Sequence, residues 1–122
     1  MQSRSRARLA SSLRLAIRSA LALGLLWGAL AASAADRPAT HTVVIEGLKF
    51  MPAALTVRAG DKVVWLNKDP YPHTATAKGV FDSGSIAAGH SWKYTASKPG
   101  EYPYLCTFHP NMKGTLRVMP VE

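Results

Sequence analysis

The sequence has 122 residues and a single cysteine, Cys106, so no disulfide can form within the chain. A fold held by internal disulfides is therefore excluded, and the thiol is an inert buried group, a bridge to another chain or a metal ligand. Heptads, helical repeats and low-complexity tracts are missing after residue 35, which argues against coiled coils and solenoids. Long apolar runs are also scarce. The uncharged run 20–32 is shorter than the ~20 residues that a helix needs to span a bilayer, which argues against a transmembrane helix.

The first 35 residues contain no acidic residue and have the composition of an export signal. Five of the fifteen basic residues lie within the first 18 positions, the apolar run 20–32 follows, and small residues occupy positions 32–35. This order describes a cleaved secretory signal peptide, with an uncleaved anchor as the alternative. Since no pair of adjacent arginines precedes the apolar run, the general secretory pathway is favoured over twin-arginine export. We therefore predict a cleaved signal peptide at 1–35 and one mature domain at 36–122.

Charge does not favour a nucleic-acid partner once the predicted leader is removed. The full chain has a formal net charge of +8, but residues 36–122 carry ten Lys or Arg and seven Asp or Glu, a net charge of +3. These basic residues are scattered, so no nucleic-acid binding is expected. A mildly basic surface instead favours an acidic patch on a protein partner. We expect a monomer without stable membrane insertion after signal cleavage.

Apolar residues of the mature domain alternate with polar ones or form short runs that Gly, Pro and Asn interrupt. This pattern is typical of strands and turns. Trp65 is expected in the core, and the prolines of 69–72 place a loop there, because proline cannot donate to a ladder. Seven or eight short strands predict an all-β, antiparallel sandwich whose loops cluster at its ends. The main strands are expected at 42–46, 55–57, 62–67, 91–95, 101–106 and 115–119.

A candidate metal site lies in the stretch 106–112 and in a histidine far upstream. Cys106, His109 and Met112 fall within seven residues, and His73 is isolated from them in sequence. One thiolate, two imidazoles and one thioether are the ligand set of a mononuclear blue-copper site. One tight loop closing against a second loop of a rigid scaffold would bring them together. The alternatives are an inert thiol or an inter-chain pairing for Cys106, a surface or structural histidine for His73, and a core or surface side chain that binds no metal for Met112.

The mature domain resembles the cupredoxins, and most of all the amicyanins. The segments that carry the resemblance are 49–57, 59–65, Pro72-His73 and 100–106, followed by Cys106-x2-His109-Pro110-x-Met112-x-Gly114. The resemblance implies a Greek-key sandwich that holds one type 1 copper ion and shuttles single electrons in the periplasm. It also implies that His73, Cys106 and His109 are the strong ligands and Met112 the weak axial one. The implied partners are redox proteins, such as a donor dehydrogenase, a cytochrome c or a terminal oxidase.

Two residues depart from the amicyanin pattern. Phe108 stands where amicyanins have a proline, so the ligand loop gains a backbone N–H. Thr74 follows the first histidine, where cupredoxins often have asparagine, and its side chain is expected to bond the ligand loop with different geometry. We also expect an apolar rim around the exposed edge of the second histidine, formed by Met51, Pro72, Phe108 and Pro110.

Two other functions compete with electron transfer. A copper enzyme module needs a second copper site with an open position, and only His41 and His90 remain as imidazole donors, both expected in solvent. No enzymatic activity is therefore expected from this chain. A copper carrier or storage protein would favour Met- and His-rich motifs, which do not occur. Reversible reduction of a blue site would separate electron transfer from storage.

Overall fold

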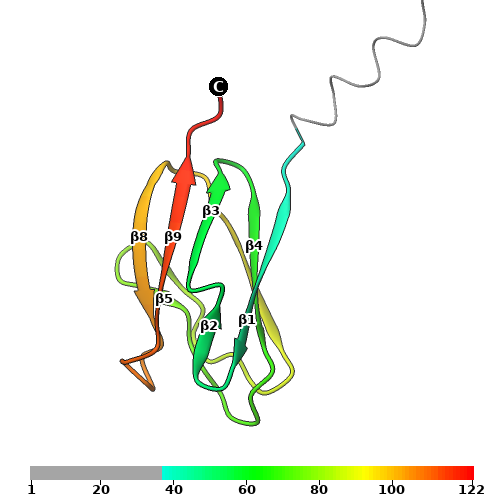
Figure 1. Ribbon diagram of the computed structural model, residues 1–122, viewed down its shortest axis with the longest axis vertical. Helices are drawn as coiled ribbons and strands as arrows, with labels where there is room; N and C mark the ends of the chain where they lie inside the picture. Colours follow the sequence, from blue (N-terminus) through cyan, green and yellow to red (C-terminus); the bar gives the residue numbers. More distant parts are fainter. Residues whose placement is uncertain (1–36) are drawn as a thin grey trace, which may run out of the picture. The chain divides into compact units, whose positions relative to one another are not determined.

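The computed structural model describes residues 37–122, so the predicted signal peptide at 1–35 lies outside the described residues and stays a prediction. Within these described residues, nine strands form two sheets that pack into a sandwich (Figure 1). One sheet has the order β2-β1-β4-β7, with bounds Lys49–Met51, Thr40–Glu46, Lys62–Asn67 and Ser91–Thr95. The other has the order β3-β9-β8-β5-β6, with bounds Ala54–Arg58, Lys113–Met119, Gly100–Leu105, Thr76–Ala77 and Phe81–Asp82.

The predicted all-β sandwich is confirmed, and two of its strand pairs are parallel. β1 pairs with β4 and β3 pairs with β9 in parallel, whereas the other neighbours are antiparallel. Parallel neighbours cannot be joined by a tight hairpin, so local turn signals do not predict them. Residues 37–122 contain no helix, and hence no helical segment that could cross a membrane.

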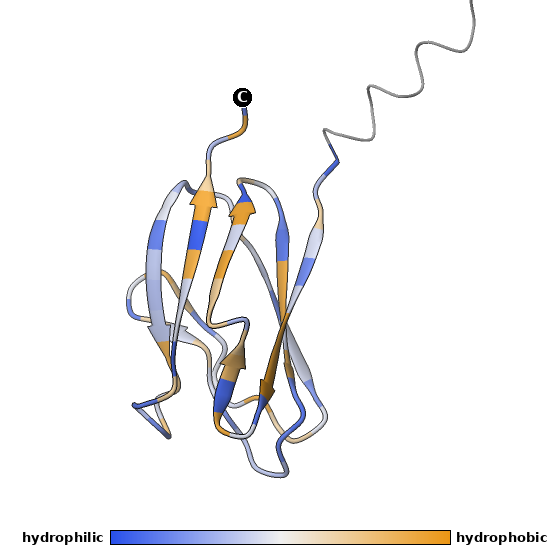
Figure 2. Ribbon diagram, in the orientation of Figure 1, coloured by the Kyte–Doolittle hydropathy of each residue, from blue (hydrophilic) through white to orange (hydrophobic). Residues whose placement is uncertain are grey.

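Alternation along the strands directs one face of each sheet into a shared core. In β9 the buried Leu116 and Val118 flank the exposed Arg117, and Figure 2 shows the corresponding change of colour along this strand. Trp65 of β4 is fully buried, which confirms its predicted core position. Its ring centroid lies 5.4 to 5.6 Å from those of Phe81, Trp92 and Tyr104. Such tilted and edge-to-face aromatic pairs add to the stabilisation that burial provides.

Tyr104 links this core to the candidate metal site. It is 4% exposed in β8 and lies two residues before Cys106, on the same face of the strand. Burial raises the pKa of Tyr104 to about 12, so its phenol stays neutral at physiological pH. β8, which ends directly before Cys106, is therefore anchored in the aromatic core.

The buried carboxylate of Asp61, in the turn between β3 and β4, hydrogen-bonds residues at the start of β1. Asp61 accepts the Ala39 N–H at 2.9 Å, the Arg58 N–H at 3.0 Å and a hydrogen bond from His41 Nε2 at 2.9 Å. Burial opposes ionisation, but these hydrogen bonds outweigh it and hold the pKa of Asp61 below its usual value. His41, which was expected in solvent, is thus partly buried and paired, whereas His90 is exposed as expected.

We expect Asp61→Asn to lower the free energy of unfolding by about 1–3 kcal/mol at neutral pH, because an amide cannot accept from all the donors that face it. Folding lowers the carboxyl pKa, so the ionised group stabilises the fold at pH values above its unfolded pKa, near 3.8. This contribution is lost as the pH falls through the folded value. Urea titrations from neutral to strongly acidic pH should therefore show the two proteins converging toward acid. A difference that is constant with pH would contradict this role.

Candidate metal centre

Residues 106–112 form a tight loop between β8 and β9, at the same end of the sandwich as the β1–β2 turn (Figure 1). Three backbone hydrogen bonds close this loop. His109 N–H donates to the Cys106 carbonyl at 3.2 Å, Met112 N–H to the His109 carbonyl at 2.8 Å, and Cys106 N–H to the Met112 carbonyl at 3.1 Å. The ends of the loop are fixed by the paired strands β8 and β9. The loop is therefore short and rigid, as its sequence predicts.

The loop that carries His73 is shaped by Asn67, which ends β4 and is fully buried. Its amide nitrogen donates to the Tyr71 carbonyl at 2.8 Å and to the Ile86 carbonyl at 2.9 Å. Its amide oxygen accepts the Asp69 N–H at 2.9 Å. His73 also exchanges two backbone hydrogen bonds with Ile86. The backbone before His73 and its bridge partner Ile86 are thus both held by Asn67, a side chain to which the sequence pattern assigns no role.

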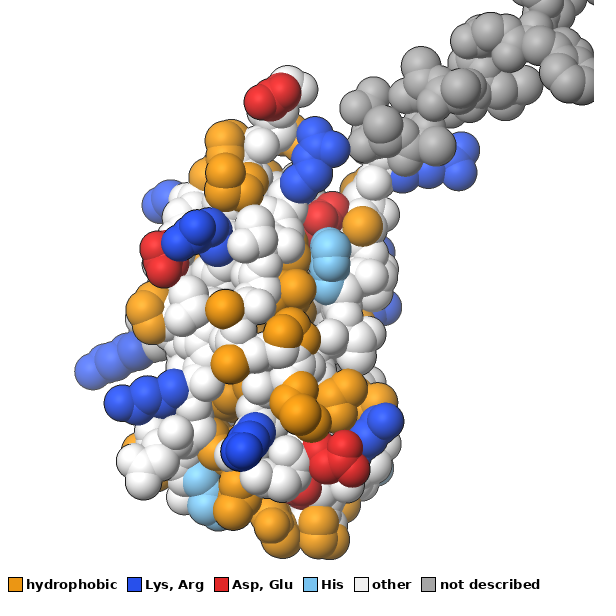
Figure 3. All heavy atoms as spheres, in the orientation of Figure 1, with side chains coloured by type: hydrophobic (Ala, Val, Ile, Leu, Met, Phe, Trp, Pro, Cys, Tyr) orange, Lys and Arg blue, Asp and Glu red, His pale blue; other side chains and the backbone are white. Residues whose placement is uncertain are grey.

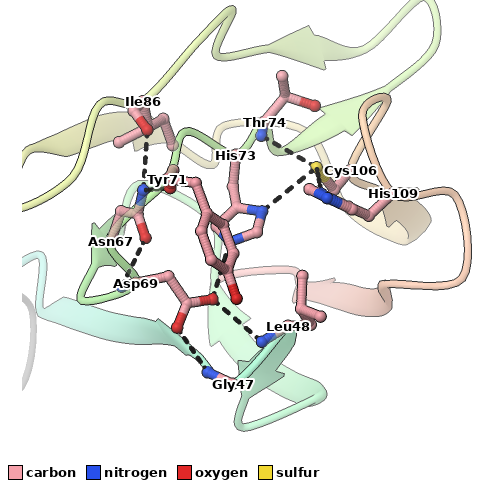
Figure 4. Close-up of polar contacts among 10 residues, drawn as sticks. All are labelled: Gly47, Leu48, Asn67, Asp69, Tyr71, His73, Thr74, Ile86, Cys106 and His109. Carbon is pink, nitrogen blue, oxygen red and sulfur yellow. Dashed lines mark hydrogen bonds and ion pairs between the residues drawn. The ribbon is translucent and has the colours of Figure 1, made fainter.

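Three of the four predicted ligands converge on one point. Figure 4 shows the imidazole rings of His73 and His109 directed at the sulfur of Cys106. The Nδ1 atoms lie 3.7 and 3.9 Å from Cys106 Sγ, and the three ligand atoms all lie within 4.8 Å of one another. If a metal ion bound nitrogen at about 2.1 Å and sulfur at about 2.3 Å with an angle of about 120° between the bonds, the nitrogen and sulfur atoms would lie about 3.8 Å apart. The spacing therefore fits a single first-row metal ion.

The burial of the candidate ligands differs. Cys106 and His73 are fully buried, whereas His109 is partly exposed. Met112 is 4% exposed and ends the loop that carries Cys106 and His109. One imidazole edge thus reaches the surface while the thiol and the other imidazole are shielded from water.

Thr74 connects the two loops that carry the candidate ligands. Its N–H donates to Cys106 Sγ at 3.3 Å, and its hydroxyl oxygen accepts the Thr107 N–H at 2.8 Å. The hydroxyl oxygens of the two threonines also lie 3.1 Å apart. An N–H donor that faces sulfur stabilises the negative charge of a thiolate. The hydrogen bond between the Thr74 hydroxyl and the Thr107 N–H confirms the expected contact of the Thr74 side chain with the ligand loop.

A buried carboxylate lies behind His73 and is not apparent from the sequence pattern. Asp69 Oδ2 lies 2.8 Å from His73 Nε2, the ring nitrogen that does not face the sulfur (Figure 4). Burial opposes ionisation of Asp69, but hydrogen bonds from Leu48 N–H, Gly47 N–H and His73 outweigh it and hold the pKa of Asp69 below its usual value. The available signal was an acid four residues before a ligand-type histidine, since metal-bound histidines commonly donate their second N–H to a carboxylate.

An apolar depression surrounds the exposed edge of His109. It has a volume of about 360 Å³ and is lined by Leu48, Tyr71, Pro72, Phe108 and His109. Figure 3 shows hydrophobic side chains gathered beside a histidine at this end of the molecule. Of the expected rim residues, Pro72 and Phe108 line the depression, and Phe108 is 51% exposed. Leu48 and Tyr71 line it in place of Met51 and Pro110.

Comparison with known proteins identifies the family. A family model described as a cupredoxin-like domain matches residues 18–118, and the chain belongs to this family. Cupredoxins bind type 1 copper, and the cluster of His73, Cys106 and His109 has donors suited to that ion.

Three curated relatives make the relationship more specific. Amicyanin from Paracoccus versutus is 36% identical over 93 residues, which are 70% of this chain and 70% of the relative. Amicyanin-alpha from Methylorubrum extorquens is 34% identical over 115 residues, which are 85% of this chain and 97% of the relative. A plastocyanin from Synechococcus is 33% identical over 112 residues, which are 71% of this chain and 79% of the relative. These similarities indicate a blue copper protein of the electron-carrier type.

Solved structures agree with this relationship. A mutant of amicyanin in the Cu(I) form has a TM-score of 0.62 and 28% identity, covering 66% of this chain and 82% of that chain. A copper-containing nitrite reductase from Thermus scotoductus has a TM-score of 0.65 and 31% identity over 70% of this chain. That match covers only 24% of the reductase chain, so the likeness is confined to one part of a larger protein.

Proposed function

We propose that this protein is a periplasmic one-electron carrier that holds one type 1 copper ion and passes electrons between redox partner proteins. The observation that carries this proposal is the convergence of Cys106 Sγ and two Nδ1 atoms, 3.7 and 3.9 Å away, on two fixed loops. His73, Cys106 and His109 would be the strong ligands and Met112 the weak axial ligand, the set found in electron-transfer copper sites. The bound ion supplies the Cu(II)/Cu(I) couple.

The residues around the site would keep it rigid during electron transfer. The loop at 106–112 is closed by its own backbone hydrogen bonds, and Asn67 and Thr74 hold the second loop against it. Ligands that are fixed in advance need little rearrangement when the oxidation state changes. The buried thiol and His73 are shielded from water, while the edge of His109 provides a short route for an electron to the surface.

The apolar depression around His109 would be the contact surface for redox partners. Apolar side chains that line it lose water readily, and interfaces of electron-transfer complexes are small and transient. A donor dehydrogenase, a cytochrome c or a terminal oxidase would each suit such a surface. The mildly basic mature domain favours partners with an acidic rim.

The copper site is tested by loading the purified mature protein with Cu(II) and recording its optical spectrum. We expect intense blue absorption that a reductant bleaches and an oxidant restores. A colourless loaded protein would contradict a type 1 site. A blue protein that cannot be cycled would favour the alternative of copper storage.

Export is tested separately by expressing the full chain in a Gram-negative host. The protein should appear in the periplasmic fraction, with a new N-terminus near residue 35. Recovery of an unprocessed chain in the membrane fraction would instead support an uncleaved anchor.

Replacing Met112 by glutamine is expected to retain the blue copper site and to lower the reduction potential. An oxygen ligand favours Cu(II) over Cu(I) more than a thioether does, and the axial ligand tunes the potential. Voltammetry of both proteins under identical conditions measures the shift. An unchanged potential would show that Met112 is not a ligand and only fills the core.

An accessory role in a copper enzyme is the second candidate, because part of a nitrite reductase has a similar fold. In residues 37–122, His41 is paired with Asp61 and His90 is exposed, and the metal-type cluster found there consists of His73, Cys106 and His109. These residues offer no second copper site with an open position. Nitrite or oxygen turnover by the copper-loaded protein would favour the enzyme role over the carrier role.

A further inference from the structure

We propose that Asp69 is a positioning residue of the copper site. Its carboxylate fixes which nitrogen of His73 carries the proton, favours the oxidised state of the site, and holds Leu48 at the apolar depression. The redox part of this inference rests on the proposed function, whereas the proton position belongs to the metal-free protein and can be tested without copper.

The two nitrogens of the His73 ring face different partners (Figure 4). Nδ1 lies 3.7 Å from Cys106 Sγ, and Nε2 lies 2.8 Å from Asp69 Oδ2. A neutral imidazole has one N–H donor, and an ionised carboxylate can only accept. Placing the proton on Nε2 therefore makes the hydrogen bond to Asp69 and leaves the Nδ1 lone pair free for a metal. The fold itself thus prepares His73 as an Nδ1 ligand.

The charge of Asp69 also acts on the redox equilibrium. Asp69 is 5% exposed and His73 is fully buried, so water screens their interaction poorly. A negative charge directly behind a ligand stabilises the more positive Cu(II) state relative to Cu(I). Removing that charge should therefore raise the reduction potential, even if every ligand remains in place.

The same carboxylate supports an unusual turn. Gly47 and Leu48 join β1 to β2 with φ values of 60° and 59°, as a type I′ hairpin requires. Glycine adopts this conformation easily, whereas leucine rarely does. Asp69 accepts the N–H of Gly47 at 2.7 Å and that of Leu48 at 3.0 Å, which stabilises the strained turn. Leu48 is 42% exposed and lines the apolar depression with His109, so one carboxylate connects a candidate ligand to the proposed docking surface.

The first test uses the purified copper-free protein at a fixed, mildly alkaline pH. Long-range proton–nitrogen NMR correlations should show a proton on Nε2 of His73, protected from exchange with water. In Asp69→Ala this signal should disappear while circular dichroism still reports a folded sandwich. A wild-type ring without the Nε2 proton, or a signal that survives in folded Asp69→Ala, would overturn the proposal.

The second test compares copper-loaded Asp69→Asn with copper-loaded Asp61→Asn as a matched control. It shows whether Asp69 acts on the copper site even if Asp69→Ala does not fold. Asp61 is likewise buried and bonded to a histidine and two backbone N–H groups, but it lies outside the cluster of candidate ligands. Asp69→Asn should stay blue, have a higher potential and bind Cu(II) about 10–100-fold more weakly. Asp61→Asn should have the wild-type potential. Equal reduction potentials in the wild type and both variants, or equal shifts of the potential in both variants, would show that Asp69 has only a structural role.

A charge-conserving variant completes the test. Asp69→Glu should remain closer to the wild-type potential than Asp69→Asn does, because it keeps the negative charge near His73. A larger shift in Asp69→Glu than in Asp69→Asn would contradict the electrostatic argument. If the wild-type protein does not form a blue copper site, the proposed function is wrong, and the NMR result still decides whether Asp69 sets the proton position of His73.

Discussion

Cys106→Ala is expected to abolish the blue colour of the copper-loaded protein while leaving its domain folded. The thiolate is the source of the intense charge-transfer absorption, and two imidazoles with a thioether cannot replace it. The substitution removes only the sulfur atom from a fully buried position, and the aromatic core around Trp65 remains intact. Visible absorption at equal copper loading and far-ultraviolet circular dichroism would measure the two effects. Persistence of the intense band would contradict the assignment of Cys106 as a ligand.

Unfolding in the presence and absence of copper gives a second readout of the same variant. A ligand that binds only the native state stabilises it by about 2.7 kcal/mol when its free concentration is 100 times its dissociation constant. The wild-type protein should gain stability of this order on copper loading, and the variant should gain much less. The two metal-free proteins provide the control, and they should unfold at similar denaturant concentrations. An equal gain in both proteins would place the copper elsewhere.

The candidate ligands could be identified from the sequence because their side chains are chemically specific and closely spaced. Cys106, His109 and Met112 occupy one loop, and the spacing alone suggests a shared site. The support of His73 could be predicted only in part: Asp69 lies just four residues before it, whereas the contacts that hold Asp69 and Asn67 in place involve distant residues. Asn67 acts through the Ile86 carbonyl, 19 residues away, and Asp69 acts through the β1–β2 turn, about as far upstream. Such contacts depend on how distant loops meet, which local patterns do not encode.

The same distinction applies to the fold. Alternating apolar residues predicted the strands and the buried position of Trp65, because a half-buried strand needs that pattern wherever it lies. The parallel pairing of β1 with β4 is different, because β2 and β3 lie between these strands in sequence. It depends on the sheet that each strand joins, which the alternation within a strand does not specify. His41 is a similar case, because its partner Asp61 lies 20 residues away and becomes its neighbour only when these two strands pair.

Gly114→Ala is expected to destabilise the domain by about 3 kcal/mol, at the upper end of the usual cost of overpacking. Gly114 lies opposite Tyr104 in the β8·β9 ladder, and a Cβ atom there would overlap the tyrosine ring and lie 2.8 Å from its Cε1. The ring cannot easily move away, because it is 4% exposed and its centroid lies 4.7 Å from that of Phe50 and 5.5 Å from that of Trp65. Chemical denaturation of the metal-free proteins would measure the loss.

A double-mutant cycle separates this steric clash from a general intolerance of side chains at position 114. Tyr104→Ala alone should be strongly destabilising, since it leaves a cavity in the core. Once the ring is absent, adding Gly114→Ala should cost little, so the two effects should be far from additive. Because Tyr104 lies in β8 only two residues before Cys106, a displaced ring should also shift the blue absorption band of Gly114→Ala. Additive losses of stability together with an unchanged band would show that Gly114 is needed for another reason.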